Sequence, residues 1–177
     1  TWQDTFKDLP SPKIAVLVGG DTKKHKFTVK HAQKMAQTLI KAAKELGGSL
    51  LITTSRRTSD EASDALHNTI VDANVPLYFY DVNTPGDNPY FGFLACADII
   101  IPSGDSISMC SESCATGKPV FIYDPKDLMP DKHQRFHLSL YQKNYARPFG
   151  DKIDVYESPT LDETKYLANE IHERFGF

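Results

Sequence analysis

The feature that most constrains this chain is the alternation between short, fully apolar runs and longer segments with helical spacing. The first run, KIAVLV at 13–18, ends in Gly19-Gly20, and the second, SLLIT at 49–53, leads into a polar loop. Between them, the apolar residues of 28–46 recur with the spacing of one helix face. A strand that is apolar throughout is buried on both sides, which is typical of parallel sheets covered by helices on both faces.

The rest of the chain continues this pattern. We expect further strands at 76–80, 98–101, 120–123 and 153–156, and further helices at 59–73, 90–96, 108–115, 133–143 and 161–175. Alternating strands and helices predict a doubly wound, Rossmann-like α/β domain of three layers, α/β/α, with strand order 3-2-1-4-5-6. Ligands of such sheets bind at the carboxyl ends of the strands, where the order switches between strands 1 and 4. That rule selects the Gly19-Gly20 turn and the segment 102–113.

Length, charge and hydropathy limit the class of protein. The 177 residues fit one domain, which we place at 13–177 behind a linker or tail at 1–12. A net charge of −3 argues against nucleic acid as a partner, because binding phosphates requires a basic surface. No apolar run approaches the roughly 20 residues that cross a bilayer, and no signal peptide is visible. We expect a cytoplasmic protein, trimmed before Thr1, and leave open a peripheral membrane attachment of the full-length protein.

The cysteines and histidines carry little sign of chemistry. Cys96, Cys110 and Cys114 form no CxxC pair, so we expect buried free thiols rather than a redox or metal site. His133 and His137 are four residues apart and share a helix face. A metal pair is one interpretation, but solvated histidines are the simpler one, and we expect no metal.

The segment 103–112, SGDSISMCSE, is the most informative for function. It follows a buried strand and opens a helix, so its backbone N–H groups suit an anion such as a diphosphate. Ser106 and Ser108 add hydroxyl donors, and the Glu112 carboxylate can accept hydrogen bonds from two ribose hydroxyls. The alternative is a Ser-capped helix on which Glu112 is a solvated surface acid.

Two other loops belong to the same predicted sheet edge. Gly19-Gly20 lets a ligand or a partner domain approach the backbone closely, or it is a simple turn. No GxGxxG follows, so it is not the dinucleotide-binding motif. Arg56 and Arg57, which follow Ser55, suit a bidentate phosphate contact, or they make surface salt bridges.

The loop after the third strand, NPYFG at 88–92, is the candidate for contact with a base. Tyr90 or Phe91 is expected to stack on the base, unless these aromatic residues belong to the core. Local signatures of a Ser-His-Asp triad, a G-x-S-x-G elbow and a Walker A loop are all missing from the sequence.

Several of these segments together resemble one family. They are LVGG at 17–20, SLLITTSRRT at 49–58, NPYFGFLACADIII at 88–101, DSISMCSESCATGKPVFI at 105–122 and RPF at 147–149. The resemblance is to the C-terminal half of proteins described in plants as mitochondrial-fission proteins of the elongated-mitochondria type, and in bacteria as nucleoside-diphosphate-sugar epimerases. It covers nearly the whole chain from Lys13 onward, and SRRT and DSxSMxSE are its most specific motifs.

That family is itself similar to GT-B glycosyltransferases and UDP-N-acetylglucosamine 2-epimerases, which have two Rossmann-like domains and an active site between them. The resemblance implies that this chain is the nucleotide-sugar-binding half and that its N-terminal partner domain, with most of the catalytic bases, is absent. It implies that Glu112 binds the ribose, that 106–108 hold the diphosphate, and that Gly19 and Gly20 lie beside the sugar phosphate. Where the 2-epimerases have Gly-Gly after Asp-Ser, this chain has Ile107-Ser108, which leaves less room for the phosphate.

We therefore expect the donor-binding domain of a GT-B-like glycosyltransferase, with a UDP-linked sugar as substrate and no separate cofactor. The expected ligand-binding residues are Gly19, Gly20, Ser55, Arg56, Arg57, Asn88, Tyr90, Asp105, Ser106, Ser108, Ser111 and Glu112. One alternative is a sugar-nucleotide epimerase. Another is a non-catalytic interaction module related to fission-machinery recruiters, whose docking face would be an exposed apolar patch at 138–145.

Overall fold

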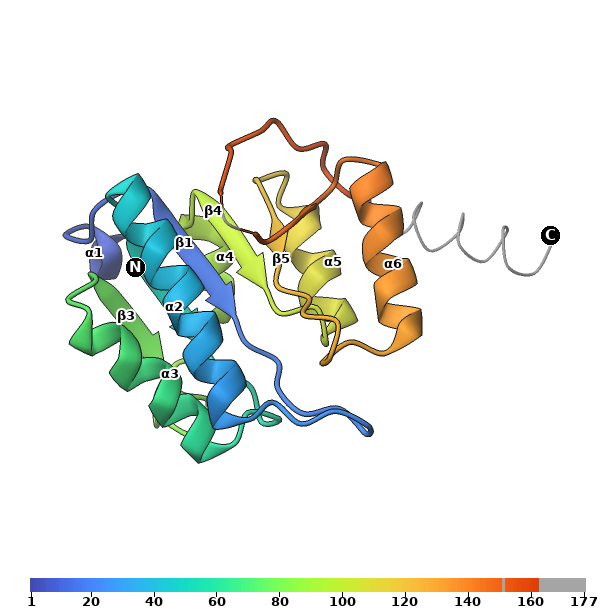
Figure 1. Ribbon diagram of the computed structural model, residues 1–177. Coiled ribbons are helices and arrows are strands. Elements are labelled where there is room, and N and C mark those ends of the chain that lie inside the picture. Colours follow the sequence, from blue (N-terminus) through green and yellow to red (C-terminus); the bar gives the residue numbers. More distant parts are fainter. Residues whose placement is uncertain (151, 163–177) are drawn as a thin grey trace, which may run out of the picture.

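The computed structural model describes residues 1–150 and 152–162 and shows a parallel sheet between two layers of helices (Figure 1). Four strands form the main sheet in the order β3-β2-β1-β4. Their bounds are Lys13–Leu17 for β1, Ser49–Thr53 for β2, Leu77–Tyr80 for β3 and Ile99–Pro102 for β4. All three pairings are parallel, with Ile14 opposite both Leu50 and Ile99.

A short parallel pair extends the sheet beyond β4. It consists of β5 (Phe121–Ile122) and β6 (Arg147–Pro148), and single bridges join Ile100 to Val120 and Ser103 to Tyr123. Through these bridges the strands follow the order 3-2-1-4-5-6. The predicted order is confirmed for the first five strands, whereas the sixth place belongs to β6 and not to the predicted segment 153–156.

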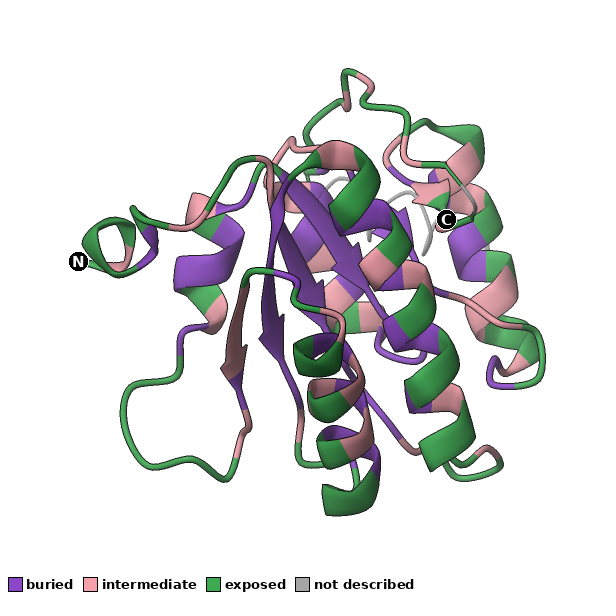
Figure 2. Cartoon of the chain, turned by 60° about the vertical axis from the view of Figure 1, so that its left-hand side comes forward, coloured by how far each residue is buried: buried purple, intermediate pink, exposed green. Residues whose placement is uncertain are grey.

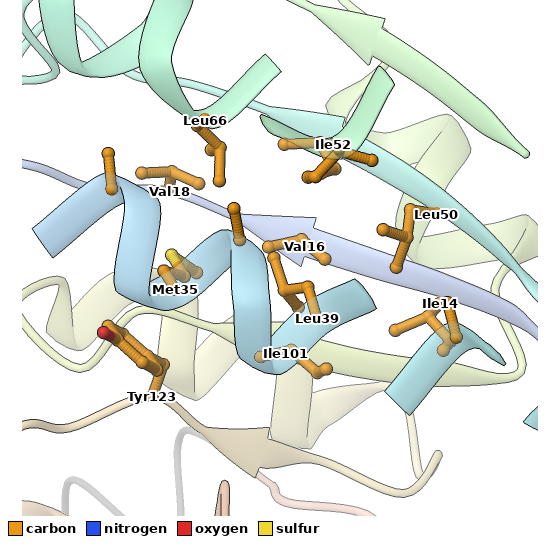
Figure 3. Close-up of a cluster of buried hydrophobic side chains, with 14 of the residues drawn as sticks. Ile14, Val16, Val18, Met35, Leu39, Leu50, Ile52, Leu66, Ile101 and Tyr123 are labelled. Carbon is orange, nitrogen blue, oxygen red and sulfur yellow. The ribbon is translucent and has the colours of Figure 1, made fainter. Parts of the chain in front are cut away.

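The helices cover both faces of the sheet. On one face lie α2 (Val29–Leu46) and α3 (Asp60–Asp72), and on the other lie α1 (Trp2–Phe6), α4 (Tyr90–Cys96), α5 (Ile107–Ala115) and α6 (Asp131–Gln142). Alternate residues of each strand point to opposite faces. Ile14 and Val16 therefore pack with α2 and α3 (Figure 3), whereas Ala15 and Leu17 belong to the second core. Two such cores explain why the strands are apolar throughout.

Local capping signals define the helix ends. Thr28 caps α2 by accepting a hydrogen bond from the His31 amide, and Gly47 ends it with a left-handed φ of 65°. Ser59 caps α3 in the same way, accepting from the amide of Ala62. Each predicted helix that lies within the described residues is present, with ends shifted by no more than two residues. The closing helix predicted at 161–175 falls almost entirely outside the described residues.

The segment 1–12, interpreted from the sequence as a linker or tail, contains the helix α1. Phe6 is fully buried against Tyr78 and Phe93, with ring centroids 5.0 and 5.5 Å apart. A Cβ on Gly92 would lie 2.4 Å from the Trp2 ring, so α1 and α4 pack closely. The two prolines pointed to an extended segment, but the apolar side chains of α1 fill the face beside α4.

The strand predicted at 153–156 is wrong. The place beside β5 is taken by β6, because the amides of Arg147 and Phe149 donate to the carbonyls of Val120 and Ile122 over 2.9 Å each. Tyr156 instead reaches Val120 with its side-chain hydroxyl, which lies 3.1 Å from the Val120 amide. Its ring also packs under the Arg147 guanidinium, 4.1 Å from the centroid.

The thiols behave as predicted at two of three positions. Cys110 and Cys114 are buried and free, and Cys96 is half-buried and free. Burial raises the pKa of the Cys114 thiol to about 12, which keeps it protonated and unreactive at neutral pH. In the described part of the chain, no helix is both long enough and apolar enough to cross a bilayer.

Candidate functional site

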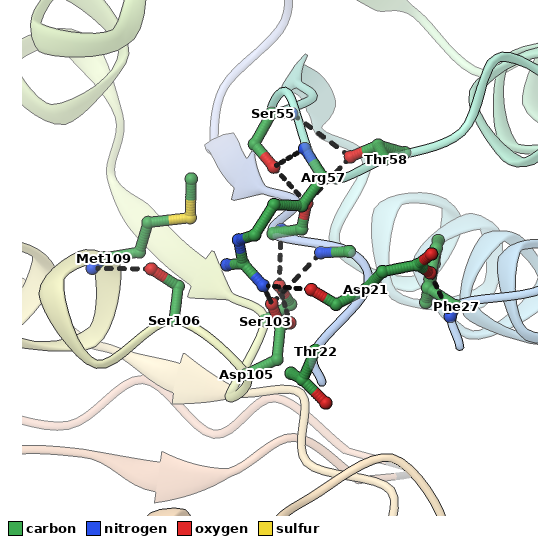
Figure 4. Close-up of polar contacts among 12 residues, drawn as sticks. Asp21, Thr22, Phe27, Ser55, Arg57, Thr58, Ser103, Asp105, Ser106 and Met109 are labelled. Carbon is green, nitrogen blue, oxygen red and sulfur yellow. Dashed lines mark hydrogen bonds and ion pairs between the residues drawn. The ribbon is translucent and has the colours of Figure 1, made fainter. Parts of the chain in front are cut away.

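Three loops meet at the carboxyl edge of the sheet, as the strand order predicts. They follow β1 (Gly19 and Gly20), β2 (Ser55 to Thr58) and β4 (Ser103 to Ser106), and Figure 4 shows their polar side chains converging. Because parallel strands all end at the same edge, loops far apart in sequence become neighbours there.

Asp105 is the centre of this polar cluster. Its carboxylate is buried, and it accepts from the Ser103 hydroxyl over 2.6 Å and from the Gly20 amide over 3.0 Å. The Arg57 guanidinium forms an ion pair with it through Nη1 at 2.8 Å. Asp105 was predicted as a ligand contact, but here its oxygens hold the three loops together.

The Arg57 side chain joins the cluster through Nη1. This nitrogen contacts Asp105 and also donates to the Asp21 carbonyl over 2.8 Å, and the side chain remains 41% exposed. Neither of these two contacts uses Nε or Nη2. Arg56 is exposed, and it makes no hydrogen bond or ion pair with the cluster in the described part of the chain.

Gly19 and Gly20 are required by the chain's own packing. A Cβ on Gly19 would lie 2.0 Å from Asp105 Oδ2, and a Cβ on Gly20 would lie 2.2 Å from the Arg57 carbonyl oxygen. The Gly19 carbonyl accepts hydrogen bonds from the hydroxyls of Ser55 and Thr58. The close approach predicted for a ligand is therefore made here by Asp105 and by the loop after β2.

The N-terminus of α5 lies at the same edge of the sheet. Ser106 caps the helix, and its hydroxyl accepts from the Met109 amide over 3.3 Å. The amides of Ile107 and Ser108 belong to the first helical turn and have no intrahelical acceptor. The hydroxyls of Ser106 and Ser108 lie 3.4 Å apart, and Ser108 is exposed. Amides, hydroxyls and the helix dipole together favour a negative ligand.

Glu112 lies further along α5 and is held by Tyr90 from α4. The Tyr90 hydroxyl donates a short hydrogen bond to Glu112 Oε2, and both residues are half-buried. Burial, together with the hydrogen bond to Glu112, raises the pKa of the Tyr90 phenol, so it stays protonated at neutral pH. The interpretation of Glu112 as a freely solvated surface acid is therefore wrong.

In the loop at 88–92, the two aromatic rings predicted to contact a base differ in their surroundings. Asn88 Oδ1 accepts from the Tyr90 amide over 3.0 Å, which fixes the start of α4. Tyr90 uses its hydroxyl on Glu112, whereas Phe91 is 74% exposed and stands perpendicular to the Tyr90 ring. Of these two rings, Phe91 is the one open to solvent. Ser111 is half-buried on α5 beside Glu112.

A buried polar group behind Gly104 was missed by sequence reasoning. His137 is fully buried and donates from Nε2 to the Gly104 carbonyl over 2.8 Å, so the interpretation of His137 as solvated is wrong. Its Nδ1 lies 3.3 Å from Asp124 Oδ2, outside hydrogen-bonding geometry, and Tyr141 donates to the same oxygen over 2.7 Å. The helical spacing of His133 and His137 was visible, but burial depends on how α6 packs.

His133, one turn earlier, is half-buried. Burial lowers its pKa, and the neighbouring His137 adds to the effect, so His133 is mainly neutral at pH 7. Among the described residues, no group of three or more His, Cys, Asp and Glu side chains is arranged to hold a metal ion.

Fold and site together define a Rossmann-like α/β domain with a polar site at the switch point of a parallel sheet. The chain belongs to the family described as Mitochondrial fission ELM1, whose model matches residues 1–175. It is 31% identical to the mitochondrial fission protein ELM1 of Arabidopsis thaliana over 99% of this chain and 40% of that protein. It is 33% identical to the uncharacterized protein RP120 of Rickettsia prowazekii (strain Madrid E) over 87% of this chain and 44% of that protein.

A solved structure shares the fold. The UDP-GlcNAc 2-epimerase of Neisseria meningitidis, bound to UDP-GlcNAc, superposes with a TM-score of 0.53 at 10% identity, over 99% of this chain and 40% of the epimerase. At this identity the similarity establishes the fold alone. The chain spans less than half the length of each of these relatives.

Proposed function

We propose that this chain is the nucleotide-diphosphate-sugar-binding domain of a GT-B-like glycosyltransferase. The observation that carries the proposal is the arrangement of α5. Its N-terminus offers the amides of Ile107 and Ser108 together with two serine hydroxyls, and the Glu112 carboxylate lies further along the same helix. Helical side chains tilt toward the N-terminus, so Glu112 leans back toward those amides. Hydrogen-bond donors at the start of the helix suit a diphosphate, and the carboxylate beyond them suits the ribose attached to it.

The chemistry of such a site is electrostatic. When the sugar–phosphate bond breaks, negative charge grows on the departing diphosphate, and preorganised donors stabilise it. In this proposal the donors are the α5 amides and the Arg57 guanidinium, which pairs with Asp105. A UDP-linked sugar is the proposed donor, and the acceptor and the catalytic base are assigned to a partner domain.

Calorimetric titration with UDP, GDP, ADP, CMP and UDP-N-acetylglucosamine tests this proposal. One of these ligands should saturate the chain, and Glu112→Gln should weaken its binding about 10- to 100-fold, because charge-assisted hydrogen bonds to the ribose are lost. Glu45→Gln is the matched control, since Glu45 is exposed near the C-terminal end of α2. Binding that is unchanged in Glu112→Gln, or no binding to a folded chain, would overturn the proposal.

Two alternatives make different predictions. A sugar-nucleotide epimerase is supported by the fold similarity to a 2-epimerase and would exchange the sugar C2 proton with heavy water in the full-length protein. An interaction module is supported by the family's link to mitochondrial fission and would tolerate loss of Glu112. Within its predicted docking face at 138–145, Leu138 is exposed and Leu140 is fully buried.

A further inference from the structure

The contact between Tyr90 and Glu112 links the start of α4 to α5. Tyr90 is the first residue of α4, and Glu112 lies in the middle of α5, 22 residues later. The hydroxyl donates to only one carboxylate oxygen, Oε2. The other oxygen, Oε1, accepts no hydrogen bond from the described part of the chain.

Both ends of this contact are rigidly supported. On one side, Asn88 holds the Tyr90 amide, and Phe93 anchors α4 in the core with full burial. On the other, Cys110 and Cys114 anchor α5 with full burial. The hydrogen bond therefore selects one orientation of the Glu112 side chain, instead of following a mobile loop.

We propose that Tyr90 is a positioning residue that orients Glu112 to read the ribose hydroxyls of the nucleotide. This inference rests on the proposed function, because it takes Glu112 as the ribose acceptor. A carboxylate oxygen has two lone pairs, so Oε2 can keep the Tyr90 hydroxyl while the carboxylate accepts from a diol. A carboxylate already held in one orientation loses less conformational freedom when the ribose binds.

Orienting Glu112 has a different effect on ligand preference from stacking on the base. A ring that stacks on the base would bind a ribonucleotide and its 2′-deoxy analogue equally well. A hydroxyl that orients Glu112 matters only for the ligand whose 2′-hydroxyl Glu112 reads. The preference for ribose over deoxyribose is therefore the property that Tyr90 controls.

The test compares UDP with 2′-deoxy-UDP by calorimetric titration of the chain and of Tyr90→Phe, which keeps the ring. We expect Tyr90→Phe to weaken UDP binding about five- to tenfold and to leave 2′-deoxy-UDP within about twofold of the unmodified chain. Tyr156→Phe is the matched control, since it removes a hydroxyl bound at Val120, beyond β4. Asn88→Ala removes the acceptor of the Tyr90 amide but keeps the side chains of Tyr90 and Glu112. It should lower the preference of the chain for UDP over 2′-deoxy-UDP.

Each contrary outcome is distinct. If the unmodified chain binds neither nucleotide, the proposed function fails and this inference fails with it. If it binds UDP in preference to 2′-deoxy-UDP and Tyr90→Phe keeps that preference, only the positioning role fails. Tighter UDP binding by Tyr90→Phe would overturn the role as well, because the hydroxyl would then compete with ribose for Glu112.

Discussion

Asp105 illustrates how single residues build this site. Its buried carboxylate receives donors from three loops, namely Ser103, the Gly20 amide and Arg57. A buried charge is costly unless it is paired and hydrogen-bonded, and here both conditions are met. The sequence marked Asp105 and Arg57 as ligand contacts separately, and only the folded chain shows that they pair with each other.

Replacing Asp105 by Asn should therefore destabilise the chain by about 2 kcal/mol. Arg57 would lose its charged partner, and the NH2 group of the new side chain would face groups that donate hydrogen bonds themselves. Chemical denaturation of both proteins measures the difference. Asp127→Asn is the matched control, since Asp127 pairs with His31 but is 69% exposed, and it should change stability by no more than about 0.5 kcal/mol. Equal effects of the two substitutions would contradict the central role of Asp105.

At the scale of the element, α5 combines a structural cap with a candidate binding site. Ser106 ends the loop after β4 and caps the helix, and the first-turn amides beyond it have no intrahelical acceptor. The cap of α2, Thr28, has the same geometry, because its hydroxyl accepts from the His31 amide. The two helices therefore offer a matched pair in which stability and ligand binding can be separated.

Ser106→Ala and Thr28→Ala should each destabilise the chain by about 1 kcal/mol, the usual cost of losing a hydroxyl cap. Only Ser106→Ala should also weaken nucleotide binding, by about three- to tenfold, because the hydroxyl is proposed to contact the diphosphate. Thermal unfolding and calorimetric titration measure the two effects. A similar loss of affinity in Thr28→Ala would show that binding follows stability, and that Ser106 has no direct role.

The described part of the chain is a sheet between two layers of helices, and in Figure 2 its strands are buried except β3, which is mostly half-buried. Polar groups collect at the carboxyl edge, and Asp81, just after β3, is one of them. Burial alone would raise the pKa of Asp81, but hydrogen bonds from Ser63, the Asn83 amide and Thr54 hold it below its usual value. Folding therefore favours the ionised form of this carboxylate.

This depressed pKa predicts a pH dependence of stability. Asp81 contributes stability at pH values above its unfolded pKa of about 4, and this contribution is lost as the pH falls through the lower folded pKa. Ser63→Ala, which removes a 2.5 Å hydrogen bond, should cost about 1.5 kcal/mol at pH 7. The difference from the unmodified chain should shrink in denaturation experiments as the pH falls below about 4. A difference that stays constant with pH would contradict the assignment.

The amino-acid sequence by itself determined most of the helices and strands. Apolar runs mark buried strands, helical spacing marks α2 and α3, and Thr28, Gly47 and Ser59 mark their ends, because each of these signals is local. The alternation predicted the parallel sheet, the order of its first five strands and the edge at which the polar cluster lies. The family resemblance added the proposed roles of individual residues.

Only the tertiary structure decided which side chains meet. Arg57 and Asp105 are 48 residues apart and Tyr90 and Glu112 are 22 apart, and no periodicity encodes such pairs. The same holds for the burial of His137, for α1 beneath α4 and for β6 taking the place of the predicted last strand. Hydrogen bonds between distant segments depend on the exact packing of helices on the sheet, which is a property of the whole chain and not of any local pattern.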